Sequence, residues 1–450
     1  MTSLELRALL GLMFLYASRM LGLFMVLPVL SLHAPQYSGA TAATIGLCLG
    51  IYGLTQGFLQ IPAGLASDRF GRKPIIVLGI LLFVAGSIIA AEASTVYQLM
   101  LGRAVQGAGA VAGVIMALLA DVTREQVRTR AMAAIGGSIG ISFAVAMALG
   151  PLIASTWGMA AVFWVTAALG ILGLPVLLSM PTPGRVETHE LVPMPDMLGR
   201  VLGDMELVRL DLGIFVLHFA QMATWVSVPV LLEQVVGFAR EQHWWLYLAT
   251  MGGGFALMVP FIWYGETRRR MKPVFLGAIA LLAVAETVLA SAGSRFAVMA
   301  AGLLLFFMAF NLLEASLPSL VSKLCPAGIK GTALGVYSTS QFLGAFAGGA
   351  IGGLAAHHFG RESVFWFAGA GALVWLAAAS TMRAPRRLRS LTLALGTEQT
   401  PIRREDMVGV VPGVEDVIHI PSHQVTYIQV DDDKLDRIRL ERILGRPVDA

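Results

Sequence analysis

The stretch "GLASDRFGRKP", from Gly64 to Pro74, is a short and highly charged segment between two long apolar runs. It holds two glycines, one aspartate and three cations, which are Arg69, Arg72 and Lys73. Such an abrupt change from apolar to charged and back is typical of a membrane protein, in which charged turns join apolar spans. We therefore predict that this segment is a tight loop between two transmembrane helices.

The composition of the whole chain supports a membrane protein. Of its 450 residues, 56% are hydrophobic and 13% are charged, whereas a soluble domain has about 25% charged residues. The net charge of +4 does not indicate nucleic-acid binding, because most cations lie in the turns between apolar runs. The two cysteines, Cys48 and Cys325, lack Cys-x-x-Cys spacing, so we expect neither a disulfide nor a metal site.

A transmembrane helix needs about 20 apolar residues, and the sequence contains twelve such runs. The runs lie at 7–30, 42–66, 74–92, 97–120, 130–156, 160–180, 211–231, 244–264, 273–292, 296–320, 330–356 and 363–382. We expect a first six-helix bundle over 1–180, a polar linker over 181–210 and a second bundle over 211–383. Residues 386–450 are soluble in character.

The distribution of cations supports this division. The connections on one side of the membrane contain sixteen cations, and those on the other side contain three. The sixteen are Arg7, Arg69, Arg72, Lys73, Arg124, Arg128, Arg130, Arg185, Arg200, Arg209, Arg268, Arg269, Arg270, Lys272, Lys323 and Lys330. The three are Arg240, Arg295 and Arg361. Because cytoplasmic loops are enriched in Lys and Arg, we expect both termini to be cytoplasmic.

The two halves contain matching landmarks. The charged segment after the second run has a weaker copy, "GETRRRMKP" (Gly265 to Pro273), after the eighth. The glycine-rich fifth run, "GGSIGISFAVAMALGP", has a counterpart in the eleventh, "STSQFLGAFAGGAIGG". Two such halves of six spans are the sequence pattern of a duplicated transporter.

The glycines and the acid of the charged segment suggest how its residues are arranged. Gly64 and Gly71 permit a tight backbone path, but Asp68 opposes the local charge and needs a partner. Asp121, at the end of the fourth run, is a candidate second acid for Arg72. We predict that these charges form a latch between the two halves; the alternative is a simple basic loop.

Several motifs resemble the major facilitator superfamily, and the resemblance extends over all twelve runs. The pattern G-x-x-x-D-R-x-G-R-K resembles its motif A, here Gly64, Asp68, Arg69, Gly71, Arg72 and Lys73. The stretch "LMLGRAVQGAGA" with Arg103 resembles motif B, and "ALGP" with Gly150 and Pro151 resembles the antiporter motif of the fifth span. "LGLFMVLPVL" (Leu21 to Leu30) resembles the first span of its drug:proton antiporters.

The resemblance implies a fold and a mechanism. The fold is an all-α membrane transporter with twelve transmembrane helices in two six-helix bundles, which rock about a central site. "FNLLEASLPSL" and "GVYSTSQFLG" resemble a bacterial group of these transporters with a small C-terminal domain of ferredoxin-like form. Resemblance also assigns Arg103 to proton movement and helix positioning.

Polar and charged residues inside apolar runs are costly and usually functional. The candidates for proton coupling or for a polar cavity are Arg19, Arg103, His218, Glu286, Asn311 and Glu314. Asn311 and Glu314 share one helix face by their spacing. Glu314 and His218 are the best candidates for binding protons, because histidine titrates near neutral pH and burial raises the pKa of a carboxyl group. Polar contacts between helices are the structural alternative.

Other side chains of the runs allow two interpretations. Arg19 is predicted to be a cavity cation or the partner of a carboxylate. Gln56, Gln60, Gln221 and Gln341 are compatible with a polar cavity lining, although periodicity does not prove it. Phe24, Met25, Trp225 and Phe307 are compatible with an apolar wall for lipophilic cargo. Such residues more commonly pack against other helices or lipid, so the site is not placed on them.

The C-terminal tail is predicted to be a small α+β domain. "LRSLTLAL", "VEDVIHIP" and "QVTYIQVD" have strand character, and "DKLDRIRLERIL" is an amphipathic helix pattern. With a helix near 401–409 the order is βαββα, a ferredoxin-like pattern. It resembles heavy-metal-associated domains but lacks their Cys-x-x-Cys, so His419 and His423 are expected at the surface. Regulation, self-association and small-ligand binding all stay open for this domain.

Together these features predict a proton-coupled antiporter that exports small lipophilic or drug-like molecules across a bacterial inner membrane. The sequence has no G-x-x-x-x-G-K-[ST] loop, so the proton gradient is the expected energy source, and no cofactor is implied. Nor is a nucleophile–base set visible that would indicate an enzyme. Two alternatives stay open: an uptake symporter for a small metabolite, and a membrane sensor that signals through the C-terminal domain.

Overall fold

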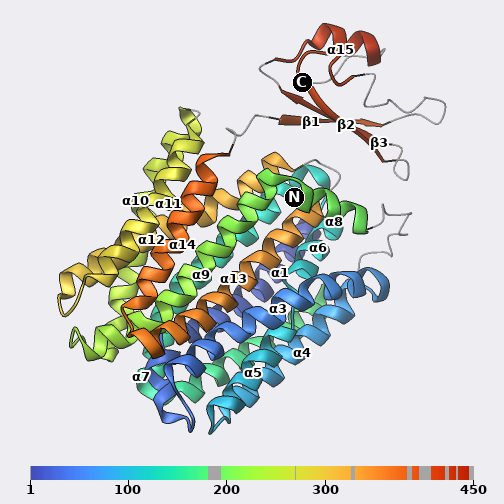
Figure 1. The fold of residues 1–450 in the computed structure, drawn as a ribbon. Coiled ribbons are helices and arrows are strands. Elements are labelled where there is room, and N and C mark those ends of the chain that lie inside the picture. The colour runs from blue at the N-terminus through green and yellow to red at the C-terminus, as the bar shows by residue number, and fades with distance from the viewer. Residues whose placement is uncertain are drawn as a thin grey trace. The chain divides into compact units, whose positions relative to one another are not determined.

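The computed structural model describes residues 2–180, 194–268, 270–325, 330–382, 388–394, 407–420, 425–431 and 434–444. Long helices make up most of these residues, and a small β-sheet follows them (Figure 1). The chain divides into two compact units. The first comprises 1–186, 212–314 and 338–380, and the second comprises 187–211, 315–337 and 381–450.

The helices follow the predicted spans closely. Those of the first half are α1 (Ser3–Val26), α2 (Leu30–His33), α3 (Ala42–Phe70), α4 (Arg72–Ala91), α5 (Val96–Ala108), α6 (Ala112–Val122) and α7 (Glu125–Ser179), with a 3₁₀ turn at Ala34–Gln36. Those that follow are α8 (Met194–Gly203), α9 (Met205–Gln234), α10 (His243–Thr267), α11 (Met271–Ala290), α12 (Phe296–Leu324), α13 (Lys330–Phe359) and α14 (Ser363–Ser380), with a 3₁₀ turn at Arg240–Gln242. The prediction of a helical membrane protein is confirmed.

Ten helical segments of the described chain are long and apolar enough to cross a membrane. One of them, in α7, runs from Arg130 to Ser179 and contains both the fifth and sixth predicted spans. Gly158 divides it, because its φ of 80° lies in the left-handed region that glycine adopts without steric cost. The eleventh predicted span coincides with α13, which is not among the ten because its glycines and polar residues lower its mean hydropathy.

The fourth predicted span is a broken helix. The chain leaves helical geometry between α5 and α6, around Gly109 and Val111. A Cβ atom on Gly109 would lie 2.3 Å from the carbonyl oxygen of Gly79 in α4. A Cβ atom on Gly107 would likewise lie 2.3 Å from the carbonyl oxygen of Tyr52 in α3. Glycine therefore allows this span to contact two neighbouring helix backbones directly.

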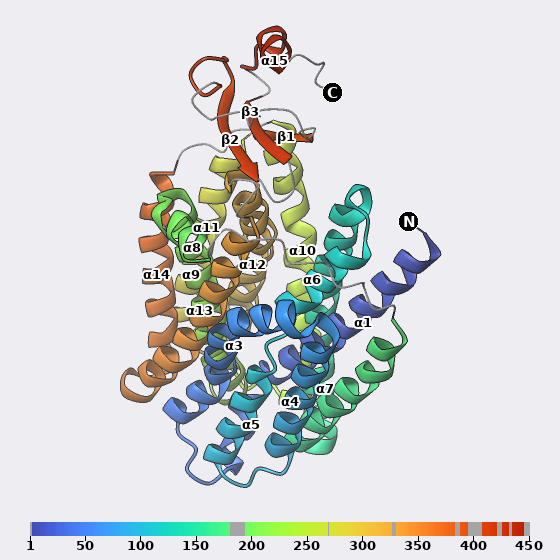
Figure 2. The same ribbon diagram turned by 90° about the vertical axis from the view of Figure 1, so that its right-hand side faces the viewer.

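A large apolar core lies in the first half. α1 packs along α7, and α4 packs against both α5 and α7, as Figure 2 shows from the side. The core includes Leu12 and Leu15 of α1, Ile76 of α4 and Leu118 of α6, all buried. Because these four residues come from helices of quite different sequence position, the bundle is held by long-range packing.

A glycine contact joins the two halves along α3 and α13. A Cβ atom on Gly46 would lie 2.2 Å from the carbonyl oxygen of Gly349, and one on Gly50 would lie 2.7 Å from that of Phe346. Small residues let membrane helices approach to backbone contact. At the other end of α3, a Cβ atom on Gly64 would have no atom of the described residues within 4 Å. The contact between the halves is thus tight along one part of α3.

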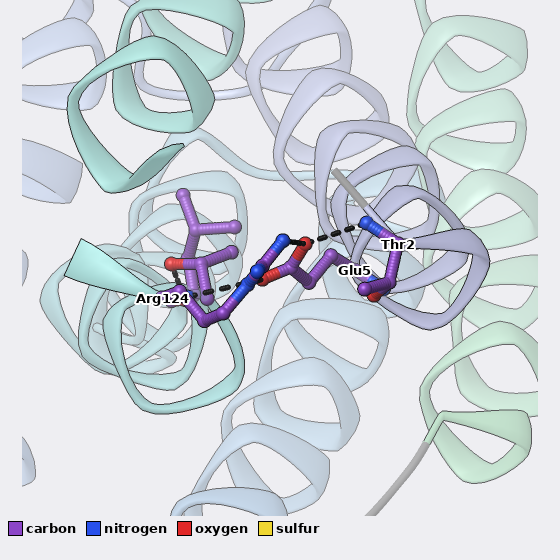
Figure 3. Close-up of polar contacts among 5 residues, drawn as sticks. Thr2, Glu5 and Arg124 are labelled. Carbon is purple, nitrogen blue, oxygen red and sulfur yellow. Dashed lines mark hydrogen bonds and ion pairs between the residues drawn. The ribbon is translucent and has the colours of Figure 1, made fainter. Parts of the chain in front are cut away.

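The start of α1 is tied to the turn before α7 (Figure 3). The Thr2 side chain accepts a hydrogen bond from the Glu5 backbone, and the Glu5 carboxylate accepts one from the Thr2 backbone, which forms a capping box. Arg124 donates to the same carboxylate from Nε at 2.8 Å and from Nη2 at 3.2 Å. Sequence inspection did not single out this contact.

The tail contains strands β1 (Leu388–Ala394), β2 (Val414–Ile420) and β3 (Val425–Asp431), and helix α15 (Arg437–Leu444). All pairs are antiparallel, and β3 lies between β1 and β2. Ile428, Val430 and Leu440 are buried together in a small core. The strand order agrees with a split βαβ unit, but the helix expected near 401–409 lies mostly outside the described residues. The ferredoxin-like domain stays a prediction.

Candidate functional site

Three polar side chains from three different helices meet in the second half. The Gln341 amide of α13 lies 2.8 Å from Nε2 of His218 in α9 and 3.4 Å from Oε1 of Glu314 in α12. His218 Nε2 lies 3.9 Å from Glu314 Oε2. His218 is almost fully buried, whereas the Glu314 side chain is 37% exposed. Both predicted proton-binding residues therefore belong to one cluster, with the glutamine as a bridge.

The hydrogen bonds of the His218 imidazole indicate which of its two ring nitrogens carries the proton. Its Nδ1 lies 3.3 Å from the backbone carbonyl oxygen of Ile214, one helical turn earlier. A carbonyl only accepts hydrogen bonds, so Nδ1 carries the proton of the neutral ring. Nε2 is then an acceptor, and it receives the N–H of Gln341. This arrangement describes a neutral histidine.

Aromatic rings connect this cluster with the first half. Phe310 of α12 packs edge-on against the His218 ring, with centroids 5.8 Å apart. Phe143 of α7 contacts Phe310 at 6.1 Å and Phe24 of α1 at 4.8 Å. Phe307 of α12 is fully buried and contacts Phe143 at 6.4 Å. These four phenylalanines, called here the aromatic cluster, bring helices of both halves together.

Arg19 lies opposite, in the first half. Its Nη2 donates to the Tyr52 hydroxyl at 3.3 Å and to Oε1 of Gln56 at 3.1 Å, both in α3. Its guanidinium also lies over the Phe83 ring, 5.7 Å from the centroid. The partners of Arg19 are thus neutral groups of the first half.

Arg103 forms a separate, fully buried network in the first half. Its Nη1 donates to Gln106 at 2.9 Å, and Gln106 in turn donates to Ser87 at 2.8 Å. Its guanidinium lies over the Tyr52 ring, with the centroid 5.0 Å away. Tyr52 therefore contacts both buried arginines, one through its hydroxyl and one through its ring.

The charged segment was predicted as a tight loop, but it is helical except at Gly71, where α3 ends and α4 begins. It has the predicted ion pairs. Arg72 donates from Nε to Asp121 at 3.0 Å and from Nη1 to Asp68 and, at 2.7 Å, to Ser67. Lys73 donates to the carbonyl oxygen of Met180 at the end of α7. All of these partners lie in the first half. A latch action between the halves stays a prediction.

The remaining motif residues have plain structural surroundings. Gly71 ends α3 with a φ of 99°, which permits the tight turn into α4. Arg69 is exposed and lies over the Phe70 ring. A Cβ atom on Gly150 would lie 2.4 Å from the carbonyl oxygen of Met25 in α1, and Pro151 follows within α7. The antiporter-like motif thus permits backbone contact between α7 and α1.

Glu286 and Asn311 are not part of the His218 cluster. Glu286 in α11 is fully buried, and its Oε1 accepts a hydrogen bond from Thr224 of α9 at 3.1 Å. Its Oε2 and the Asn311 amide nitrogen have no hydrogen-bond partner within the described chain. In the same part of the chain, no group of three or more His, Cys, Asp and Glu side chains is placed to hold a metal ion.

Sequence reasoning missed several residues of these clusters. Tyr52 was missed, although it lies four residues before Gln56, which the sequence had offered as a cavity-lining residue, and this i, i+4 polar pair was a usable signal for a partner of Arg19. Phe143, Phe310 and Thr224 had no such signal, because aromatic and threonine side chains are common in membrane helices. Only the packing reveals that they touch functional candidates.

The chain belongs to the Major Facilitator Superfamily, whose family model matches residues 12–205 and 210–413. It is 44% identical over 453 residues to the inner membrane transport protein YajR of Escherichia coli, and the match covers 99% of this chain and 98% of that protein. It is 29% identical over 365 residues to the multidrug resistance protein MdtH of Aeromonas hydrophila, covering 75% of this chain and 85% of that one.

The fold is also that of solved transporters. A bacterial homologue of the human lysosomal transporter Spinster, in an inward-facing and occupied conformation, superposes with a TM-score of 0.70. The match covers 84% of this chain and 97% of that one at 15% identity. The chain is therefore a multi-pass membrane transporter with a small-molecule substrate, as its family membership and its helices require.

Proposed function

We propose that this transporter is a proton-coupled antiporter that exports small, largely apolar molecules across a bacterial inner membrane. The observation that carries the proposal is the hydrogen-bonded cluster of His218, Gln341 and Glu314. A carboxyl group and an imidazole inside the membrane are costly, and they are typical of proton relays. Here they share one bridging amide, so a change in the charge of either group alters the contacts of the other.

Proton binding is coupled to the arrangement of the cluster because His218 Nε2 accepts a hydrogen bond in the neutral ring and donates one in the charged ring. In the neutral ring, Nε2 accepts from Gln341, and the same amide also reaches Glu314 Oε1 at 3.4 Å. Protonation of Nε2 turns an acceptor into a donor. The Gln341 N–H then loses its acceptor, and the new N–H of His218 has Glu314 Oε2 at 3.9 Å as its carboxylate partner. Proton binding therefore rearranges the cluster beside the aromatic rings.

The tight contact between α3 and α13 supports alternating access by this chain. Backbone contact at Gly46 and Gly349 holds the halves together along one part of α3, while a Cβ atom on Gly64, near the other end, would meet none of the described residues within 4 Å. In the Major Facilitator Superfamily, transport is a rocking of the two bundles about a site between them. A proton that rearranges side chains next to the aromatic cluster acts where the halves meet.

Two further observations support export of largely apolar cargo. The aromatic cluster places apolar side chains of both halves beside the His218 cluster. The relative from Aeromonas hydrophila is named a multidrug resistance protein. The inner-membrane location is supported by the name of the E. coli relative, an inner membrane transport protein. The cytoplasmic orientation of both termini is supported by the distribution of cations.

The test is proton counterflow in proteoliposomes with an imposed pH gradient. We expect a cargo to dissipate the gradient while moving against the protons, and the Glu314→Gln variant to reduce this to the level of protein-free liposomes. Binding of the cargo should persist in that variant, because the amide keeps the shape of the carboxyl group. Glu241→Gln, which changes an exposed carboxylate outside the cluster, is the matched control. Cargo that moves with protons would instead indicate uptake symport.

A further inference from the structure

Arg19 is a buried cation that has only neutral partners in the described chain. The residue is 7% exposed. Its contacts are the Tyr52 hydroxyl, the Gln56 carbonyl and the Phe83 ring. None of the ion pairs of the described residues includes it. A buried charge without a counter-charge is strongly unfavourable, so the site needs an anion in some step of the transport cycle.

The groups around Arg19 are hydrogen-bond donors without acceptors. Nε and Nη1 of Arg19 and Nε2 of Gln56 are buried and have no hydrogen-bond partner in the described residues. The Tyr52 oxygen accepts from Arg19, so its own hydrogen remains to be donated. Arg19 and the two side chains that it contacts therefore carry donors that are not used within the described chain. Such a set is complementary to a carboxylate, which has only acceptors.

The space beside Arg19 and the surrounding surface define the rest of the ligand. A small cavity adjoins Arg19 and is lined by Leu15, Ser18, Phe83 and Gly170 among others. Its walls are mainly apolar, and it lies inside the first half. The ligand therefore carries its charge at Arg19 and places its apolar body against these walls of the first half.

We propose that Arg19, together with Tyr52 and Gln56, binds the carboxylate of a transported organic anion that has an apolar body. This names the substrate class of the proposed antiporter and in that respect rests on it, although the binding itself can be measured without transport. The carboxylate of the ligand supplies the negative charge that no described residue places beside Arg19. Export of such an anion against protons moves positive charge inward by both routes, so the membrane potential drives it as well.

Binding to the full-length protein in detergent tests the site directly. The probes are naphthalene-1-acetate, the neutral naphthalene-1-acetamide and the cation 1-naphthylmethylamine, compared by equilibrium dialysis. These share one ring system and differ in charge. We expect the acetate to bind about tenfold more tightly than the amide and the amine to bind most weakly. Equal binding of the acetate and the amide would overturn the proposal.

Variants separate recognition from a general structural role. Arg19→Gln should weaken acetate binding about 30-fold and leave amide binding within about twofold. Arg19→Lys should restore part of the loss, because it keeps the charge. Arg240→Gln removes a cation that pairs with Glu233 elsewhere and should change nothing. A loss of amide binding equal to the loss of acetate binding would mean that Arg19 is structural, and the proposal would fail.

Flux measurements distinguish this inference from the proposed function. If the acetate binds in an Arg19-dependent manner but no probe exchanges with protons, the anion site stands and the antiporter fails. If only the amine or the amide exchanges with protons, and Arg19→Gln leaves that exchange intact, the antiporter stands and the anion site fails. Acetate efflux should also accelerate with an inside-negative potential, and a rate independent of potential would contradict export of the anion.

Discussion

The two halves of the transmembrane region share an architecture but differ in the charges they enclose. The first half holds the buried cations Arg19 and Arg103, whereas the second holds Glu286 and Glu314 in spans 9 and 10. Each of these groups is hydrogen-bonded mainly to neutral side chains of its own half. The difference teaches that the duplicated scaffold is independent of the polar groups inside it, whose charge differs in sign between the halves.

The ends of the helices, by contrast, show what the halves have kept in common. Lys73, at the start of α4, donates to the carbonyl oxygen of Met180 at the end of α7. Lys272, at the start of α11, donates to that of Ser380 at the end of α14, 3.0 Å away. A cation at a helix C-terminus satisfies an orphan carbonyl and the helix dipole. The lysine of each copy therefore joins the third and sixth spans of its own half.

The loop around this lysine differs between the copies. In the first half, Arg72 has ion pairs with both Asp68 and Asp121. In the second half, Glu266, Arg268 and Arg270 form no ion pair with any residue that the structure describes. The copy thus retains the lysine contact without the network of acids, and this asymmetry can be tested.

The largest expected effect concerns the buried acid of the second half. Thr224→Val keeps the shape of the side chain but removes the hydroxyl that donates to Glu286. A buried acceptor without its partner costs about 1–3 kcal/mol. We expect the free energy of unfolding, measured by denaturant titration in detergent, to fall by that amount. Thr224→Ser keeps the hydroxyl and should retain most of it. An unchanged stability would show that Glu286 does not depend on this bond.

A smaller effect is expected at the charged loop of the first half. Asp121→Asn removes one of the two acids that hold Arg72, in a partly exposed pair worth up to about 1 kcal/mol. If the pair stabilises one state of the cycle, transport in proteoliposomes should change about fivefold while overall stability changes little. Glu266→Gln in the second-half copy is the matched control and should have no effect. Equal effects of the two variants would contradict the asymmetry between the loops.

The smallest effect concerns the feature that the halves share. Lys73→Met and Lys272→Met each remove one hydrogen bond to a terminal helix carbonyl while they retain an apolar side chain of similar length. Each should lower the free energy of unfolding by about 0.5 kcal/mol, the lower end of the range for a hydrogen bond, because both bonds lie at helix ends that are not fully buried, and the two losses should be similar. The measurement is the same denaturant titration, with both single variants and the double variant. A loss in only one half would show that the lysine contacts are not equivalent.

Much of the fold could be predicted because each transmembrane helix makes its backbone hydrogen bonds within its own segment, whatever the other segments do. A run of about 20 apolar residues is stable in lipid as a helix whatever its neighbours are. The predicted spans therefore coincide with helices even where α7 joins two of them and where α5 and α6 divide one. The exact breaks near Gly109 and at Gly158 depend on neighbouring backbones and chain direction, which hydropathy does not report.

Much less of the site was predictable. Glu314 and His218 were recognised as unusual because charged groups are rare in membrane helices. Their meeting through Gln341, which is 123 residues from His218, is not encoded in any local pattern. The same holds for the contact of Arg19 with Tyr52, since a hydroxyl in an apolar helix has many possible neighbours. The pairing of Arg72 with Asp121 was predictable because motif and charge both restricted the choice.

The sequence by itself determined that this protein crosses a membrane many times, where its charged loops lie and to which superfamily it belongs. These properties follow from local composition and short motifs, because the hydropathy of each segment by itself decides whether that segment spans the bilayer. Only the tertiary structure decided that His218, Gln341 and Glu314 form one cluster, that Glu286 stands apart with Thr224, and that Arg19 faces only neutral groups among the described residues. Those facts depend on how distant helices pack, and close packing selects partners by shape and distance rather than by position in the chain.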